Sequence, residues 1–478
     1  MIEIVLSRND FEYDITSLVK AFYPLEDIAL KPVDSPEIII KVEYLENQIK
    51  ISFVKGDVED VECQNDVNYE DRKETKNQLK RVIYRILSRQ TCKKLPWGTL
   101  TGIRPVMLPM AFLEQGESYD NTKKLVMDRY YVSDKKAELS INVAKKEISM
   151  LEGLDYKSGY SLYIGIPFCP STCLYCSFTS FAIDKFDSLV DNYLDALEKE
   201  IRFVINHMNK MPDTIYIGGD TPTSLSEDRL DRLLTIIDEV CDFDKIYEYT
   251  VEAGRPDSIT REKLKIMKRH NVGRISINPQ TMNQKTLDLI GRKHTVREII
   301  EVFNLARELG FDNINMDIIV GLPDENIDDI RHTLDEIMKL NPDSFTVHSL
   351  ALKRASRLNI NKDEYLTDRV NNSDEIMDAT IECAKKMGME PYYLYRQKNM
   401  AGNMENVGYS KPGKECLYNV LIMEEKQDII AIGAGASTKK VNYEGLKTEH
   451  EFNIKDVKGY IERIDEMIER KRTFVERR

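Results

Sequence analysis

Three cysteines in one short run have the types and the spacing to carry out chemistry. Cys169, Cys173 and Cys176 lie in the segment IGIPFCPSTCLYCSF, directly after an apolar stretch that is typical of a strand. Thiolates at this spacing can bind three irons of a [4Fe–4S] cube and leave the fourth iron open to a small molecule, whereas a cluster that only transfers electrons normally has four cysteine ligands. The next cysteine along the chain is Cys241. The run therefore predicts a reactive cluster.

A structural zinc site is the main alternative for this run. It would need a fourth Cys or His ligand, and none follows at the spacing of a zinc ribbon. Disulfides are typical of short, cysteine-dense chains in oxidising compartments, whereas this chain has 478 residues and eight cysteines. The spacing favours the cluster with an open iron.

The amino-acid composition of the chain argues against some classes of binding partner. The 81 acidic and 68 basic residues give a formal charge of −13, which argues against a mainly electrostatic nucleic-acid partner. The first residues lack the basic and apolar regions of a signal peptide, and no apolar run is long enough to span a bilayer. These features predict a cytoplasmic protein with reduced cysteines and no membrane partner.

The cysteine run opens a segment in which strand and helix patterns alternate. Six apolar, β-branched runs occur between residues 160 and 355, namely LYIGIPF, TIYIGG, YTVEA, RISINPQ, NINMDIIV and SFTVHSL. Helical patterns lie between them, and Thr295 with Glu298 forms the capping box of one helix. Strands joined by helical crossovers form a parallel sheet, and right-handed crossovers curl six such units into a partial (β/α)6 barrel. A flat, doubly wound sheet is the alternative.

Two α+β domains are expected beside this α/β barrel. Residues 1–155 contain strand, helix and hairpin patterns, and the sequence does not indicate their role. Residues 356–478 contain a helix, the strand YYLYRQ, a loop with several glycines, the strand DIIAIGAGAS and a closing helix. The expected domains are thus residues 1–155, 160–355 and 356–478.

Polar residues follow one predicted strand after another, at the edge where ligands bind in such barrels. They are Gly218, Gly219 and Asp220 after the second strand, Glu252 at the third, Gln280 after the fourth, Asp317 within the fifth and His348 near the end of the sixth. Most have an ordinary explanation when taken singly, such as a tight turn, a helix start or a structural histidine. Asp317 is the hardest to dismiss, because an unpaired buried carboxylate is costly. Their shared position predicts one polar ligand site.

These features together resemble the radical S-adenosylmethionine (SAM) superfamily over residues 162–350. The runs YIGIPFC, GGDTPT, TVEAGRPD, RISINPQ, GRKHT and NMDIIVGLP further resemble the group of oxygen-independent coproporphyrinogen III oxidases. The flanking runs WGTLTGIRP, TVHSLALKRASRL, YYLYRQKNMAGN and AIGAGAS are most similar to the HemZ branch of that group.

The resemblance implies a radical enzyme whose cofactors are a [4Fe–4S] cluster and SAM. The implied cluster ligands are Cys169, Cys173 and Cys176, and the implied SAM-binding residues are Gly218, Gly219, Asp220, Glu252, Gln280, Arg292 and Asp317. Tyr163 would lean toward the sulfonium and is the implied catalytic residue. The implied reaction is the oxidative decarboxylation of coproporphyrinogen III to protoporphyrinogen IX, with flavodoxin or ferredoxin as the type of electron donor.

Three departures from the group's pattern bear on the specific decarboxylation rather than on the radical chemistry. Asp220 stands where the group usually has glycine, Gly165 where it has histidine, and Phe178 where it has a further cysteine. Two alternative functions are a haem-binding chaperone of the HemW type and a radical SAM enzyme that acts on intact haem. The HemW branch tends to carry an HNxxYW run, and the nearest match here, CLYNVLIM, lacks the histidine and the tryptophan.

A tetrapyrrole substrate with four propionates also predicts cations at its site. Candidates lie in the two runs around the sixth strand and the strand YYLYRQ, and they are Lys353, Arg354, Arg357, Arg396 and Lys398. Arg can bind a carboxylate through two N–H groups, and Lys acts as a point charge. Solvated surface charges are the alternative.

Overall fold

The computed structural model describes residues 1–177, 180–351, 353, 356–360, 372–398, 400–443 and 447–476. The chain divides into two compact units. The first contains residues 1–145 and 395–405, and the second contains residues 146–394 and 406–478. The segment 395–405 therefore packs in the first unit, although the residues on both sides of it belong to the second.

The first unit is built on a five-stranded sheet in the order β2-β1-β3-β4-β5. Its strands are β1 (Ile2–Leu6), β2 (Ile28–Ala29), β3 (Ile38–Tyr44), β4 (Ile49–Lys55) and β5 (Val58–Gln64). Alternating apolar residues of the sheet pack against the apolar faces of α1 (Glu12–Phe22) and α2 (Arg72–Thr91). The helices α3 (Met107–Glu114), α4 (Tyr119–Tyr130) and α5 (Asp134–Leu151) follow. The amino-terminal part is α+β, as expected, and its boundary lies within α5.

Residues 395–405 complete the interior of the first unit. The carboxylate of the fully buried Glu405 accepts a hydrogen bond of 2.7 Å from Nε1 of Trp97 and forms an ion pair of 2.6 Å with Lys136. Arg396 is 5% exposed and donates to the carbonyl oxygen of Leu100 at 2.6 Å. These polar groups are satisfied within the unit, as buried charges must be.

The six expected strands form consecutive parallel neighbours in the second unit. They are β6 (Tyr160–Ile166), β9 (Thr214–Gly219), β10 (Glu248–Gly254), β11 (Arg274–Ile277), β12 (Ile314–Val320) and β13 (Ser344–Ser349). Their order in the sheet follows the chain without a reversal. A doubly wound sheet reverses its order at a switch point, so this order excludes that alternative.

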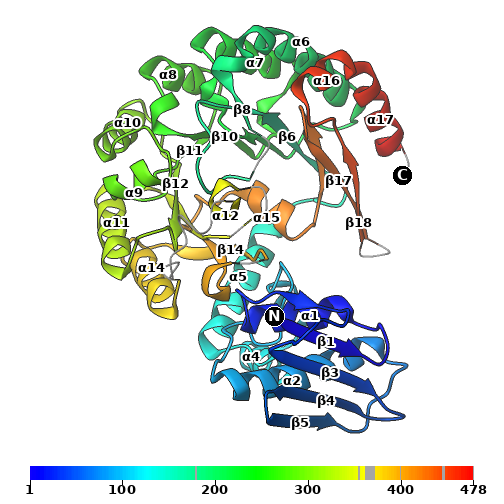
Figure 1. Ribbon diagram of the computed structural model, residues 1–478. Coiled ribbons are helices and arrows are strands. Elements are labelled where there is room, and N and C mark those ends of the chain that lie inside the picture. The colour runs from blue at the N-terminus through cyan, green and yellow to red at the C-terminus, as the bar shows by residue number, and fades with distance from the viewer. Residues whose placement is uncertain are drawn as a thin grey trace. The chain divides into compact units, whose positions relative to one another are not determined.

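The crossover helices cover one face of this sheet. They are α6 (Ile183–His207), α7 (Glu227–Val240), α8 (Arg261–Arg269), α9 (Gln284–Leu289), α10 (Val296–Glu308) and α11 (Ile327–Leu340). In Figure 1 they follow one another around the outside of the strands. Right-handed crossovers between strands in chain order place every helix on the same face, and this confirms the partial barrel. No helix within the described ranges is long and apolar enough to cross a membrane.

Residues 356–478 differ from the expected separate domain, because their strands extend the same sheet at both edges. At one edge β15 (Asn406–Ser410) pairs antiparallel with β13, and β14 (Glu390–Tyr395) follows it. At the other edge β16 (Asp428–Ile432) pairs parallel with β6, followed by β17 (Ser437–Asn442) and β18 (Lys447–Phe452). A partial barrel has two open edges with unpaired backbone groups, and these strands satisfy them. Along the chain, α14 (Asp374–Lys386) precedes β14, α15 (Leu417–Met423) lies between β15 and β16, and α16 (Val457–Glu462) and α17 (Ile464–Glu476) follow β18.

Candidate active site

The cluster loop, residues 167–177, begins where β6 ends. Within it β7 (Phe168–Cys169) pairs with β8 (Phe181–Ala182), just before α6. Cys169 and Cys176 are partly exposed, and Cys173 is buried. Sγ of Cys169 lies 3.1 Å from Oγ1 of Thr221, and burial raises the pKa of the Cys169 thiol to about 12. Because a thiol binds metal as the thiolate, a positively charged metal group would stabilise the ionised form here.

The three thiols do not form a site for a single metal ion. In the part of the chain that the structure describes, no three Cys, His, Asp or Glu side chains are placed to hold a metal ion. A structural zinc site is a closed set of four ligands around one ion.

Later segments of the second unit fix the cluster loop in place. The N–H of Leu174 donates to the carbonyl oxygen of Ile290 at 3.0 Å, and the N–H of Leu358 donates to the carbonyl oxygen of Leu174 at 2.9 Å. Arg357, the first residue of α12 (Arg357–Ile360), donates from Nη2 to the carbonyl oxygen of Thr172 at 2.7 Å. The loop thus has a defined shape that its own short sequence does not impose.

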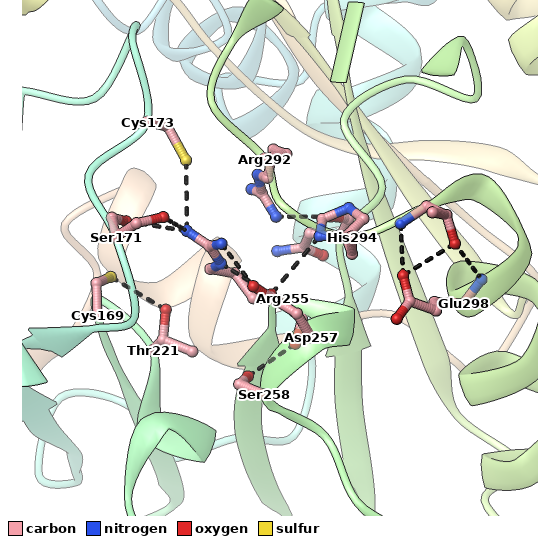
Figure 2. A network of polar contacts seen from close by, with 12 residues as sticks. Cys169, Ser171, Cys173, Thr221, Arg255, Asp257, Ser258, Arg292, His294 and Glu298 are labelled. Carbon is pink, nitrogen blue, oxygen red and sulfur yellow. Dashed lines mark hydrogen bonds and ion pairs between the residues drawn. The ribbon is translucent and has the colours of Figure 1, made fainter. Parts of the chain in front are cut away.

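Arg255 contacts the same loop from the end of β10, and the sequence had not singled it out as a site residue. Figure 2 shows its guanidinium group between Ser171 and Cys173 on one side and Asp257 on the other. The only sequence signal is an Arg and an Asp two residues apart, directly after a strand that carries a site residue. Such a pair is equally typical of a solvated turn, so its role became visible only in the fold.

The glycine pair at the end of β9 allows close packing. A Cβ atom on Gly218 would lie 2.8 Å from Oε2 of Glu252, and one on Gly219, whose φ is 105°, would lie 2.9 Å from the carbonyl oxygen of Ile166. Asp220 follows, and its N–H donates to that same carbonyl oxygen at 2.9 Å. Burial raises the pKa of Asp220 to about 7, and its Oδ2 has no hydrogen-bond partner among the described residues.

Glu252 and Asp317 lie close to one another at the same edge. Burial and the charges of Asp317 and Asp220 raise the pKa of Glu252 to about 8. Burial would also raise the pKa of Asp317, but His348 and Asn315 outweigh it and hold that pKa below its ordinary value. Nδ2 of Asn315 donates to Asp317 at 2.7 Å, and Nε2 of His348 lies 3.7 Å from the carboxylate. His348 is thus a partner of a site carboxylate.

Gln280 adopts a strained backbone conformation at its strand end. Its φ is 70°, which is uncommon for a residue with a side chain, yet its N–H and its carbonyl oxygen both bond to β12, at Asp317 and Ile319. Its Oε1 is buried and finds no partner in the described ranges. Backbone strain of this kind concentrates at functional sites.

Arg292 lies between the cluster loop and the end of β11. Its Nη2 donates to the hydroxyl of Tyr175 at 3.0 Å, and its Nη1 donates to the carbonyl oxygen of Asn278 at 3.2 Å. Its Nε is buried without a partner in the described part of the chain. The side chain therefore retains one donor for a further acceptor.

Tyr163 belongs to a stack of three tyrosine rings. Its cross-strand partner Tyr216 lies 6.3 Å away between ring centroids, and Tyr418 of α15 lies 6.2 Å from Tyr163 and 4.5 Å from Tyr216. The three rings are nearly parallel, with interplanar angles between 15° and 20°. A Cβ atom on Gly165 would lie 3.3 Å from the carbonyl oxygen of Ile432 and 3.4 Å from the ring of Tyr163, so this glycine lies directly beside the stack.

The predicted substrate cations are divided between the two units. Arg357 is exposed beside the cluster loop, and Lys353 lies near Cys176, whose charge partly offsets the lowering of the lysine's pKa by burial. Arg396 is buried in the first unit with backbone partners, so the prediction that it offers a cation to a substrate is wrong. Lys398, also in the first unit, lies over the ring of Tyr13 at 4.6 Å. Arg354 and Phe178 lie outside the described residues.

Known proteins are similar to this chain in sequence. A family model described as the Radical SAM superfamily matches residues 163–337. The oxygen-independent coproporphyrinogen-III oxidase-like protein HemZ of Bacillus subtilis is 41% identical over 84% of this chain and 82% of its own length. The heme chaperone HemW of the same species is 33% identical over 64% of this chain and 76% of its own length.

A solved structure is similar to this chain in fold. Coproporphyrinogen III oxidase (HemN) from Escherichia coli matches 67% of this chain and 73% of its own, with a TM-score of 0.52 and 23% identity. Radical SAM proteins use a [4Fe–4S] cluster and SAM, and these are the cofactors of this protein. The chain belongs to the radical SAM superfamily and, within it, to the family of oxygen-independent coproporphyrinogen-III oxidase-like proteins.

Proposed function

We propose that this protein is a radical SAM oxidoreductase that converts two propionates of coproporphyrinogen III to vinyl groups, giving protoporphyrinogen IX without oxygen. The radical chemistry rests on one observation, the edge of the barrel at which Asp220 lies near Cys169 of the cysteine loop and also near Glu252, which in turn lies near Asp317. The tetrapyrrole substrate is supported by the 41% identity to an oxidase-like relative over most of both chains.

Three polar atoms at this edge, which have no hydrogen-bond partner among the residues that the structure describes, fit the chemistry of SAM. They are Oδ2 of Asp220, Oε1 of Gln280 and Nε of Arg292, and all three are buried. The carboxyl group of Asp220 suits an ammonium group, and the guanidinium of Arg292 suits a carboxylate. Glu252 would accept hydrogen bonds from ribose hydroxyls, next to the close backbone approach that Gly218 and Gly219 allow. The thiolates of Cys169, Cys173 and Cys176 would hold three irons and leave one for the methionine group of SAM.

The chain's own residues orient these groups and exclude water. When bound, the cluster and SAM supply the radical chemistry that removes a hydrogen atom from a propionate carbon. Each propionate then loses carbon dioxide and one electron, which passes to a one-electron acceptor, and a vinyl group remains. A donor of the flavodoxin or ferredoxin type would supply the electrons for the cluster. The rings of Tyr163, Tyr216 and Tyr418 fill the space beside Glu252 with apolar surface.

Cations beside the cluster loop would bind the propionates that do not react. Arg357 is exposed there and donates from Nη2 to the carbonyl oxygen of Thr172. Among the described residues no other hydrogen bond of its guanidinium group is found, and its remaining N–H groups would face a carboxylate. Arg357→Gln should therefore weaken turnover of coproporphyrinogen III and leave cluster content unchanged. Arg331→Gln, an exposed arginine paired with Glu375 on the helical side, is the matched control.

The decisive assay is anaerobic reconstitution with iron and sulfide, followed by SAM, a reductant and coproporphyrinogen III. We expect protoporphyrinogen IX and carbon dioxide as products. Cys173→Ala should abolish both cluster assembly and product, because the loop offers no substitute ligand. Cys241→Ala, at the end of α7, should leave the iron content unchanged. Full iron content in Cys173→Ala would contradict the assignment of the cluster ligands.

A haem chaperone is the second candidate function, and the 33% identity to heme chaperone HemW favours it. Such a protein would bind haem tightly and form no protoporphyrinogen. The assay therefore includes haem and coproporphyrinogen III side by side. Haem transfer without any change in the porphyrinogen would replace the proposed decarboxylation, and an altered haem product would indicate a radical enzyme that acts on intact haem.

A further inference from the structure

Arg255 donates almost all of its side-chain hydrogen bonds to the cluster loop and to one carboxylate. The residue directly follows β10 and is 3% exposed. One nitrogen, Nη1, donates to the carbonyl oxygen of Ser171 at 2.9 Å and to its hydroxyl at 2.9 Å, and lies 3.9 Å from Sγ of Cys173. A buried positive charge is therefore held next to a thiol that we assign to the cluster.

Asp257 balances this charge from the other side. Its two carboxylate oxygens accept from Nε and Nη2 of Arg255 at 3.0 Å and 2.7 Å, a bidentate arrangement that fixes the plane of the guanidinium group. Nδ1 of the buried His294 lies 3.6 Å from the same carboxylate. Figure 2 shows these residues as one continuous network that ends at Cys173.

We infer that Arg255 and Asp257 set the reduction potential of the cluster, with Arg255 as a positioning residue for the cysteine loop. Hydrogen bonds to the sulfurs, net charge and solvent exposure set the potentials of iron–sulfur clusters. A positive donor beside a ligand sulfur stabilises the more negative, reduced cluster and raises its potential. A carboxylate that neutralises the donor limits this rise. Arg255 thus raises the reduction potential of the cluster, and Asp257 limits that rise.

This inference rests on the proposal that Cys173 is a cluster ligand, and it is independent of the substrate. If the two residues only held the loop in shape, losing either one would loosen the loop in the same way. If they act as a charge pair, losing Arg255 would lower the reduction potential and losing Asp257 would raise it. The sign of the two shifts therefore separates the two roles.

The test is a redox titration of the reconstituted full-length protein without SAM or substrate, followed by electron paramagnetic resonance of the reduced cluster. We expect Arg255→Gln to lower the ratio of reduced to oxidised cluster about tenfold at a fixed ambient potential, which is 59 mV for a one-electron couple. Asp257→Asn should raise the ratio, and Arg255→Lys should restore most of the loss because it keeps the charge. Arg261→Gln, which removes an exposed arginine of α8 that pairs with Glu308 of α10, should change nothing.

Shifts of the same sign in Arg255→Gln and Asp257→Asn, or no shift in either, would overturn the inference. Should Arg255→Gln fail to assemble a cluster, the upward shift in Asp257→Asn decides, because that variant keeps the guanidinium beside Cys173. Iron content per chain, measured in parallel, reports on the loop itself. Loss of decarboxylation with both opposite shifts intact would count against the proposed substrate and not against this role of the pair.

Discussion

The acidic side chains Asp220, Glu252 and Asp317 lie near one another at one edge of the barrel. Glu252 is the most affected, since burial and the neighbouring Asp317 and Asp220 raise its pKa to about 8. At neutral pH the cofactor-free protein therefore holds a proton on this carboxyl group, while the unfolded chain does not. Ionisable groups whose pKa is shifted this far by burial and by neighbouring charges are typical of ligand sites.

The stability of the cofactor-free protein should fall as the pH rises from about 4.5 to about 8. Between these values the folded state binds more protons at Glu252 than the unfolded state does, so raising the pH favours unfolding. We expect Glu252→Gln to reduce the fall in the free energy of unfolding over this pH range by on the order of 2–4 kcal/mol. Thermal unfolding at pH 5 and pH 8 measures it, with the exposed Glu308→Gln as control. A variant whose pH dependence equals that of the wild type would show that the carboxyl group is solvated.

The same substitution should weaken SAM binding, although it stabilises the cofactor-free protein at pH 8. Glu252→Gln replaces one of the two carboxyl oxygens by an NH2 group, and loss of one hydrogen-bond acceptor at a buried site costs about 1–3 kcal/mol, which is roughly a ten- to hundredfold loss of affinity. Calorimetry on the reconstituted protein measures this. Unchanged affinity would place the ribose away from Glu252.

The short helix α15 places a third tyrosine ring beside the two tyrosines on the first two strands of the barrel. The carboxylate of Glu248 accepts the N–H groups of Leu417 at 2.6 Å and Tyr418 at 3.4 Å, and so caps the start of this short helix. A seven-residue helix is not stable by itself. Its position therefore depends on the cap and on the packing of Tyr418 against Tyr163 and Tyr216.

Tyr418→Ala should destabilise the second unit by about 3–5 kcal/mol, because it leaves a cavity in place of a stacked ring. Tyr418→Phe keeps the ring and should cost less than about 1.5 kcal/mol. Urea unfolding followed by circular dichroism compares the two. Equal losses in both variants would mean that the hydroxyl group, and not the stack, is what stabilises the helix.

Elements whose signals are local could be predicted from the sequence. The six strands follow from alternating apolar runs, and the capping box of Thr295 and Glu298 is present at the start of α10. The placement of the carboxyl-terminal strands could not be predicted, because a short strand has the same alternation whichever sheet it joins. Arg396 was misjudged for a similar reason, since only the fold reveals which charged side chains find buried partners.

At the scale of the whole molecule, the single tryptophan reports on the unusual path of the chain. Trp97 of the first unit donates to Glu405, which follows most of the barrel in sequence, and Glu405 is also paired with Lys136. Fluorescence of Trp97 therefore monitors whether residues 395–405 are in place, while the cluster absorbance monitors the second unit.

Glu405→Ala should destabilise the first unit by about 3–5 kcal/mol, because it leaves the ammonium of Lys136 buried without its counter-charge. Denaturant unfolding followed by tryptophan emission measures this loss. Glu37→Ala breaks an exposed ion pair with Lys55 in the same unit and should cost less than about 1 kcal/mol. A loss in Glu405→Ala no larger than in this control would contradict the role of the buried pair.

The path of residues 395–405 also imposes an order of events during synthesis. The first 145 residues leave the ribosome early, but the indole of Trp97 and the ammonium of Lys136 must wait for Glu405. At about 5–20 residues per second the intervening stretch of roughly 250 residues takes on the order of 12–50 s to translate. Throughout that interval the amino-terminal unit lacks residues 395–405, and its buried pair of Lys136 and Glu405 forms only after β13, the last of the six barrel strands, has been made.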